Sequence, residues 1–228
     1  MYVFFFCSCG CSRDSMGLWL RQEGEDYRLG VWKIEETPEE LFGLLPRNPL
    51  YEEQLAGIHS AHRKTEWLAV RVLLSVLTDE SLYILYYPSG RPCLNDLSWQ
   101  ISISHTRGYV AVLLSRSLRP GIDIEQYGTR VRRIARRFIH PEEVVSVYQE
   151  TDVWSLLLHW SAKEVMFKCL DKEKVDFAEH LRIAPFEVLQ TGHFDVVESR
   201  TPDNHRFRIC YYLSPEFVMT WSFMEETC

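Results

Sequence analysis

Hydrophobic and polar positions follow two different periods along this chain. Short apolar or alternating segments, of the kind that form strands, occur at residues 17–21, 27–34, 83–87, 100–104, 109–114, 121–125, 181–189, 193–198 and from 205 onward. Spacing of three and four residues, which is typical of helices, extends over residues 51–77, in one or two pieces, and over residues 151–170. A long helix followed by strands therefore occurs twice, which predicts an α+β protein.

The two long predicted helices differ in how much of their surface is apolar. The first has one core-facing stripe, formed by Trp67, Val70, Leu74 and Leu77. The second is apolar nearly all round, as buried helices are, yet Lys163 and Glu164 lie in its middle. Because buried charges are costly unless they are paired or coordinate a metal, these two residues are candidates for a functional role.

Shorter helices are predicted from their start signals. Thr37 can cap a helix that begins at Pro38, and Glu40 can reach back to it as in a capping box. Residues 131–138 are expected to form a basic helix, and Pro141 to begin another short one.

A polar, proline-ended segment from Ser115 to Pro120 is the best candidate for a domain boundary. We expect residues 16–118 to form an N-terminal half and residues 119–228 a C-terminal half. Each half is predicted to be a long helix packed on a small, mainly antiparallel sheet, and the two halves to be pseudo-symmetric. Residues 1–15 continue no pattern of the core, so we expect an atypical extension with Met16 as the true start.

Composition narrows the class of protein. With 46% hydrophobic and 25% charged residues the chain has the composition of a soluble globular protein, and no apolar run is long enough to span a membrane. The net charge of -7 argues against nucleic acid bound through its phosphates. The cysteine count of 7 is odd and has no disulfide or zinc spacing, so we expect reduced thiols and a cytoplasmic protein.

The segment Gly121 to Glu125 carries the strongest chemical signal. In a strand, Asp123 and Glu125 share a face with Gly121, so two carboxylates lie side by side. Glu164 of the buried helix would add a third, and carboxylates with phosphate oxygens are the ligands that Mg²⁺ prefers. The alternatives are the wet face of an amphipathic strand and, for Glu164, a weak salt bridge to Lys168.

Other polar residues have two interpretations each. Arg63, Lys64 and Arg71 depart from the apolar stripe of the first long helix, and they are either solvated or line an anion site. His105 follows Ser104 at a strand end, where it either contacts a phosphate or a hydroxyl or is merely exposed.

Three motifs together resemble one family. They are Ser102-Ile103-Ser104-His105, Gly121-Ile122-Asp123-Ile124-Glu125 and Trp160-Ser161-Ala162-Lys163-Glu164 with Phe167-Lys168. In this order and spacing they resemble the 4′-phosphopantetheinyl transferases, in the larger class with two similar halves in one chain. The resemblance extends from about Met16 to the end. It implies Mg²⁺-dependent transfer of phosphopantetheine from coenzyme A to a serine of an apo acyl or peptidyl carrier protein, with release of 3′,5′-ADP.

The resemblance also implies roles in the C-terminal half. Asp123, Glu125 and Glu164 match the metal ligands, for Mg²⁺ or alternatively Mn²⁺, and Asp123 also belongs to the coenzyme A site. Glu164, directly or through a water, is the candidate base for the serine hydroxyl. Lys163 is expected to stabilise the pyrophosphate of coenzyme A and is therefore counted as both catalytic and cofactor-binding.

In the N-terminal half the resemblance implies contacts to coenzyme A. Arg63 and Lys64 match cations for the 3′-phosphate, and Ser104 with His105 matches a contact to a coenzyme A phosphate. Gly90-Arg91-Pro92 resembles a Gly-Lys-Pro turn near the adenine, with Arg91 in place of the commoner lysine.

Partners and rival classes complete the expectations. The basic helix, with Arg132, Arg133 and Arg136, either steers an acidic carrier protein or is a solvated face. His140 replaces the small residue that often precedes Pro-Glu-Glu in the family. We expect a monomer. A metal-dependent nuclease would need a basic groove, which the net charge of -7 makes unfavourable. A nucleotide-binding module without activity would have lost a carboxylate, whereas all three are present here.

Overall fold

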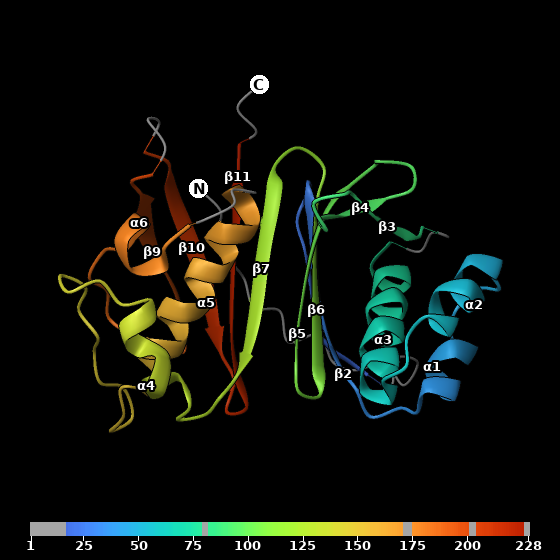
Figure 1. Ribbon diagram of the computed structural model, residues 1–228, viewed down its shortest axis with the longest axis horizontal. Coiled ribbons are helices and arrows are strands. Elements are labelled where there is room, and N and C mark those ends of the chain that lie inside the picture. The colour runs from blue at the N-terminus through green and yellow to red at the C-terminus, as the bar shows by residue number, and fades with distance from the viewer. Residues whose placement is uncertain (1–16, 79–81, 171–174, 201–203, 226–228) are drawn as a thin grey trace. The chain divides into compact units, whose positions relative to one another are not determined.

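The computed structural model describes residues 17–78, 82–170, 175–200 and 204–225. They form two compact units, which divide between Ser117 and Leu118 (Figure 1). Both units combine helices with antiparallel strands, so the predicted α+β class is confirmed. The predicted extension, residues 1–15, lies outside the described residues. Among the described helices none is both long and apolar enough to cross a membrane.

The first unit places one long helix on an antiparallel sheet. Its elements are β1 (Leu18–Glu23), β2 (Tyr27–Lys33), α1 (Pro38–Gly43), α2 (Pro49–Ala56), α3 (Ala61–Thr78), β3 (Ile84–Tyr86), β4 (Pro92–Leu94), β5 (Gln100–Thr106) and β6 (Tyr109–Ser115). The sheet has the order β1-β2-β6-β5, and β3 pairs separately with β4. Helix α3 packs on β2 and β6.

The second unit repeats this plan with a second long helix. Its elements are β7 (Arg119–Gln126), α4 (Val131–Ile134), the 3-10 helix η1 (Ala135–Arg137), α5 (Val153–Leu170), α6 (Phe177–His180), β8 (Leu181–Ile183), β9 (Thr191–Glu198), β10 (Arg206–Leu213) and β11 (Phe217–Met224). The sheet has the order β7-β11-β10-β9-β8. Helix α5 packs mainly on β7 and β11.

The two units have the same connectivity between the long helix and three strands of the sheet. In each unit the strand before the long helix pairs with the unit's last strand, which pairs in turn with the strand before it, giving β2-β6-β5 and β7-β11-β10. In each, the long helix packs on the first two strands of that series. The repeated helix-and-sheet pattern of the sequence therefore has a counterpart in topology, while pseudo-symmetry between the units stays a prediction.

Several local predictions are confirmed. Thr37 forms the capping box, since its hydroxyl accepts from the Glu40 N–H at 3.3 Å while the Glu40 carboxylate accepts from the Thr37 N–H at 2.8 Å. The helical segment 51–77 is indeed in two pieces, α2 and α3.

Other local predictions are wrong. Pro141 begins a turn and not a helix, because the Glu143 carboxylate accepts from the backbone N–H groups of His140 and Ile183 and holds the segment in a loop. The strand predicted over residues 181–189 ends at Ile183, and Pro185 follows with no N–H to continue a ladder. The segment from 205 onward forms two strands, β10 and β11, instead of one.

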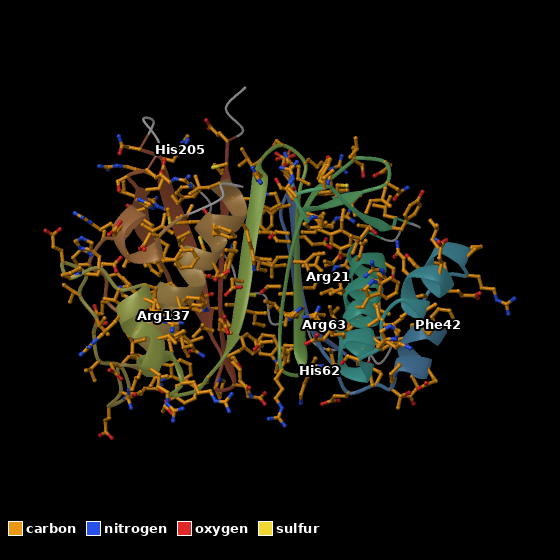
Figure 2. All side chains as sticks on the ribbon, viewed as in Figure 1. Arg21, Phe42, His62, Arg63, Arg137 and His205 are labelled. Atoms are coloured by element: carbon orange, nitrogen blue, oxygen red, sulfur yellow. The ribbon has the colours of Figure 1, made fainter. Side chains whose placement is uncertain are left out.

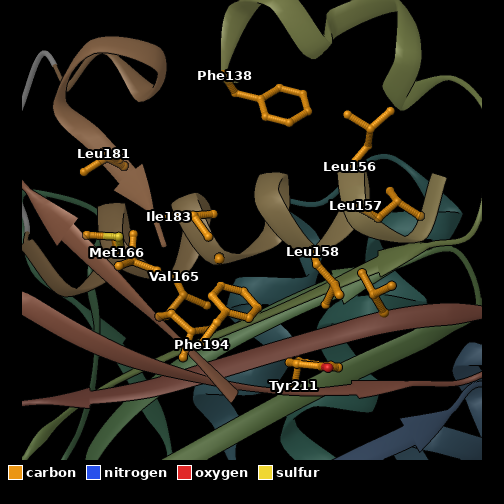
Figure 3. Close-up of a cluster of buried hydrophobic side chains, with 14 of the residues drawn as sticks. Phe138, Leu156, Leu157, Leu158, Val165, Met166, Leu181, Ile183, Phe194 and Tyr211 are labelled. Carbon is orange, nitrogen blue, oxygen red and sulfur yellow. The ribbon is translucent and has the colours of Figure 1, made fainter. Parts of the chain in front are cut away.

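Helix α5 is buried on more than one side, as its all-round apolar pattern predicts. Figure 3 shows Leu158 and Val165 of α5 toward Phe194 and Tyr211 of the sheet, with Phe138 on the other side of the helix. All of these apolar side chains belong to one buried cluster. A charged residue of α5 is therefore either enclosed by the protein or confined to a narrow accessible strip.

Gly121 of β7 allows α5 to approach the sheet closely. A Cβ atom at this position would lie 2.6 Å from Cys169 Sγ and 2.9 Å from the Val165 carbonyl oxygen, both on α5. These distances are shorter than real Cβ contacts, and one of the two neighbours is backbone. The glycine therefore sets the spacing between the strand and the helix that carry the candidate carboxylates.

We expect Gly121→Ala to lower the free energy of unfolding by about 2 kcal/mol, within the range for an overpacked core. Urea denaturation followed by circular dichroism measures this. Gly43→Ala is the matched control, because a Cβ there meets nothing within 4 Å. Gly43→Ala should leave the free energy of unfolding at the wild-type value or raise it by up to about 1 kcal/mol. Equal effects of the two substitutions would show that α5 is not packed closely against Gly121.

Candidate active site

The three predicted carboxylates lie on two packed elements of the second unit. Asp123 and Glu125 are on β7, and Glu164 is on α5, which packs against β7. Asp123 is only 5% exposed, and its neighbour Ile122 on the opposite face is fully buried. Both faces of β7 are therefore covered at this point, so the alternative of a wet amphipathic face is wrong for Asp123.

Electrostatics indicates that the three carboxylates lie close together. Burial, followed by the charge of Asp123 and then that of Glu164, raises the pKa of Glu125 from 4.5 to about 7. Burial and the charge of Asp123 also raise the pKa of Glu164. Negative charge is thus concentrated at one place and only partly compensated, which is the condition that a cation would relieve.

Two side chains of α5 hold the carboxylates of β7. The Lys168 ammonium donates to Asp123 Oδ1 at 2.9 Å and to the Ile122 carbonyl oxygen at 2.8 Å. The Trp160 indole N–H donates to Glu125 Oε1 at 2.7 Å. Lys168 therefore forms its ion pair with Asp123, and the alternative that Glu164 merely pairs with Lys168 on a helix surface does not describe the structure.

The chemistry of this donor set fits a hard divalent cation. Three carboxylates offer oxygen ligands, and the raised pKa values of Glu125 and Glu164 reflect burial and the negative charge beside them. Within the part of the chain that the structure describes, no group of three His, Cys, Asp or Glu side chains is arranged as a ready-made metal centre. The side chains of the three carboxylates would thus need to move to bind one ion together.

Lys163 lies elsewhere than predicted. Its side chain is fully buried, and its ammonium donates to the Glu143 carboxylate at 2.8 Å and to the carbonyl oxygens of Phe138 and Phe177 at 2.5 and 3.0 Å. Burial lowers the pKa of Lys163, and the Glu143 charge opposes that shift. Because the Lys163 side chain is fully buried and its ammonium already has three acceptors, this placement does not support the expected contact between Lys163 and pyrophosphate.

Sequence reasoning missed Glu143 and gave Trp160 and Lys168 no role at the site. The side chain of Glu143 is fully buried, and its two oxygens together accept from Lys163 and from the N–H groups of His140 and Ile183. The available signals were the Pro-Glu-Glu sequence at 141–143 and the position of Trp160 and Lys168 one turn before and after Glu164.

The first unit brings several of its predicted residues to the start of α3. Arg63 and Lys64 lie in the first turn of that helix, and Figure 2 shows Arg63 beside His62 there. Glu66 links this turn to the end of β5, since its Oε1 lies 3.6 Å from His62 Nδ1 and 3.7 Å from His105 Nδ1. His105 and the cations at the start of α3 therefore belong to one neighbourhood.

The remaining predicted residues of the first unit lie on strands and their turns. Ser104 is on β5 and is 8% exposed, so its side chain is directed mainly into the protein. Gly90 takes a left-handed φ of 84° in the turn between β3 and β4, which favours glycine. Arg91 lies with its guanidinium 4.7 Å from the centre of the Tyr87 ring. Pro92 begins β4.

Arg71, whose role the sequence left open, is neither solvated nor exposed. It is 2% exposed, its guanidinium lies 3.3 Å from the Trp67 ring centre, and it donates to the Trp67 carbonyl oxygen at 3.1 Å. Burial lowers its pKa to about 10, against the raising influence of Tyr86. The interpretation of Arg71 as a solvated cation is therefore wrong.

Comparison with known proteins gives a match in the second unit. Residues 119–222 match the family model described as the 4'-phosphopantetheinyl transferase superfamily. This segment contains all three candidate carboxylates, and residues before 119 lie outside the match. No curated protein matches the chain. The match therefore supports, over residues 119–222, the resemblance of this chain to the 4′-phosphopantetheinyl transferase superfamily.

Proposed function

We propose that this protein transfers 4′-phosphopantetheine from coenzyme A to a serine of an apo acyl or peptidyl carrier protein, releases 3′,5′-ADP and requires Mg²⁺. The observation that carries the proposal is the proximity of Asp123, Glu125 and Glu164 inside the segment that matches the superfamily. Three close carboxylates, of which Glu125 and Glu164 have raised pKa values, suit a site that acts on a metal-bound pyrophosphate.

The proposed chemistry relies on positioning and electrostatics. The serine hydroxyl attacks the phosphorus that carries pantetheine, and 3′,5′-ADP is the leaving group. When bound, the divalent cation would neutralise charge on the pyrophosphate. Glu164 accepts the hydroxyl proton, binds the metal, or does both, and burial favours the protonated state that a base must reach. Lys168 forms an ion pair with Asp123 beside them.

Coenzyme A recognition is assigned to the first unit. We propose that Arg63 and Lys64 bind the 3′-phosphate and that His105 contacts a phosphate, because all three lie in the neighbourhood of Glu66. His105 has a half-exposed side chain, at 57%, so it is accessible to a ligand. Gly90, Arg91 and Pro92 are proposed to lie near the adenine, where the Arg91–Tyr87 stack would present a flat surface.

Replacing both Arg63 and Lys64 with alanine should raise KM for coenzyme A strongly and KM for dephospho-coenzyme A much less. Charge-assisted contacts to phosphate are worth about 1.5–3 kcal/mol each, so the loss of two raises KM for coenzyme A roughly 100-fold or more. Initial rates with both substrates measure it. An equal loss on the two substrates would assign the pair another role.

The carrier protein is proposed to approach the basic segment of α4 and η1. Arg132, expected to steer the carrier, donates from Nε to Asp152 Oδ1 at 2.7 Å and so secures the start of α5. Arg133, Arg136 and Arg137 are exposed, and Figure 2 labels Arg137 in this segment. These three remain available for an acidic partner, and their effect should appear in the association rate at low salt.

One assay separates this proposal from its rivals. The protein is incubated with coenzyme A, Mg²⁺ and an apo carrier protein, and intact mass is recorded. A carrier that gains one phosphopantetheine, with matching release of 3′,5′-ADP, supports the proposal. An unmodified carrier with coenzyme A bound to the protein would indicate an inactive nucleotide-binding module, and a nuclease would neither modify the carrier nor bind coenzyme A. Chromatography with light scattering tests the expected monomer, and fractionation tests the cytoplasmic location.

A further inference from the structure

Trp160 occupies an unusual position between a carboxylate and two aromatic rings. Its indole N–H donates to Glu125 Oε1 at 2.7 Å. Its ring centre lies 5.3 Å from that of Phe138 and 5.6 Å from that of Phe177. The two rings belong to segments on either side of α5 in the sequence, so the orientation of the indole depends on how both segments are held.

The buried ammonium of Lys163 holds both of those segments. It donates to the backbone carbonyl oxygens of the same two residues, Phe138 and Phe177, whose rings contact Trp160. Its third acceptor, Glu143, also accepts from the N–H groups of His140 and Ile183, which fixes the adjoining loop and strand β8. The buried Lys163–Glu143 ion pair therefore fixes the backbone at Phe138 and Phe177, whose rings contact Trp160.

We propose that Trp160 is a positioning residue for Glu125, and that the Lys163–Glu143 ion pair acts on the site only through the Phe138 and Phe177 rings that hold Trp160. The proposal rests on the proposed function, since it treats Glu125 as a metal ligand. The indole N–H can only donate, so it fixes Oε1 as an acceptor and orients the carboxylate. Partners that orient metal-binding carboxylates commonly matter for metal affinity about 10–100-fold.

This proposal gives Lys163 a structural role, whereas the resemblance implied that Lys163 contacts pyrophosphate. Its ammonium already has three acceptors and no exposed surface. Removing it would leave the Glu143 carboxylate buried without its cation, which is destabilising. Variants of this pair therefore need a readout that separates the orientation of Trp160 from general loss of stability.

The first test uses the indole resonance of Trp160 in ¹⁵N-labelled protein, without metal or substrate. Trp160→Phe assigns the resonance by its loss. A hydrogen bond to a carboxylate should shift the indole proton downfield and slow its exchange. Glu125→Gln should then move this indole resonance more than any other. A resonance that Glu125→Gln leaves in place would overturn the proposal, whether or not the protein is a transferase.

The second test measures the Mg²⁺ concentration that gives half-maximal transfer. Trp160→Phe keeps a ring and removes the donor, so this concentration should rise about tenfold, at the lower end of the range for such partners. Trp154→Phe is the matched control: it is the same change on the same helix, in a residue that is 7% exposed and whose ring centre lies 4.2 Å from that of Tyr127. Its Mg²⁺ requirement should stay at the wild-type value. Equal requirements in both variants would overturn the role of Trp160.

The third test addresses the ion pair through Glu143→Gln and Lys163→Met, with Lys163→Arg as the conservative change should Lys163→Met not fold. Glu143→Gln and Lys163→Met should shift or broaden the Trp160 indole resonance and raise the Mg²⁺ requirement, while KM for coenzyme A at saturating Mg²⁺ stays unchanged. Lys163→Arg should recover part of both effects. A raised KM with an unaltered indole resonance would place Lys163 at the substrate and overturn the proposal. Absence of transfer by the wild type would refute the proposed function alone, because the resonance needs no turnover.

Discussion

Replacing Glu164 with glutamine should lower kcat by about two orders of magnitude or more, the usual range for loss of a general base. Glutamine keeps the shape of the side chain but can neither accept the serine proton nor supply charge to a metal. The burial that raises the pKa of Glu164 already indicates a site in which water compensates poorly for a missing group. Steady-state kinetics with saturating carrier protein and coenzyme A measures the effect.

The two roles of Glu164 are separable in the same variant. If ligation dominates, extra Mg²⁺ restores part of the rate, because the defect is partly one of metal occupancy. If the base role dominates, saturating Mg²⁺ restores nothing, while metal-free binding of coenzyme A is unchanged. Glu187→Gln, the same change at an exposed position of the same unit, should have wild-type kinetics. Near-normal turnover of Glu164→Gln at low Mg²⁺ would remove Glu164 from the site.

The carboxylates of β7 could be predicted from the sequence because a strand has a simple period. Asp123 and Glu125 must share a face of any regular strand, and Gly121 on that face leaves room for a neighbour. The close contact of Gly121 with Val165 and Cys169 shows that the neighbour is α5. Local pattern thus identified both the paired carboxylates and a position of close packing.

The roles of the two lysines of α5 could not be predicted in the same way. Lys163 and Lys168 are five residues apart, which places them about 140° apart around a helix. Hydrophobic periodicity selects a face only where one side of a helix is polar, and α5 is buried on nearly all sides. The structure turns Lys168 toward Asp123 and Lys163 toward Glu143, and only tertiary packing decides between those directions.

In the loop after η1, a local sequence signal predicted a helix that long-range hydrogen bonds prevent. Pro141 followed by two glutamates resembles a helix start, but Glu143 bonds to Lys163 and to the Ile183 N–H, which are 20 and 40 residues away. These long-range bonds satisfy the carboxylate better than capping a short exposed helix would, since both groups are buried. A sequence window around Pro141 contains neither partner.

The carboxylate site should also make the metal-free protein less stable as pH rises. Because the pKa of Glu125 is raised to about 7 in the folded protein from 4.5, its stabilising contribution is complete below about pH 4.5 and is lost as pH rises through 7. A shift of this size corresponds to roughly 3 kcal/mol, at 1.36 kcal/mol per pKa unit. Urea denaturation in the presence of a chelator, at pH values from 5 to 8, measures the decline.

Glu125→Gln should remove most of that decline, because glutamine carries no charge and can still accept from the Trp160 indole. The variant is then expected to match the wild type near pH 5 and to exceed its stability at pH 8 by about 2–3 kcal/mol. Added Mg²⁺ should stabilise the wild type at pH 8, since the ion binds only the folded state, and should stabilise the variant much less. A wild-type stability that is constant from pH 5 to 8 would mean that Glu125 carries no unfavourable charge. In a metal site, unfavourable negative charge in the metal-free protein is relieved when the cation binds. That result would therefore also weaken the assignment of Glu125 as a ligand.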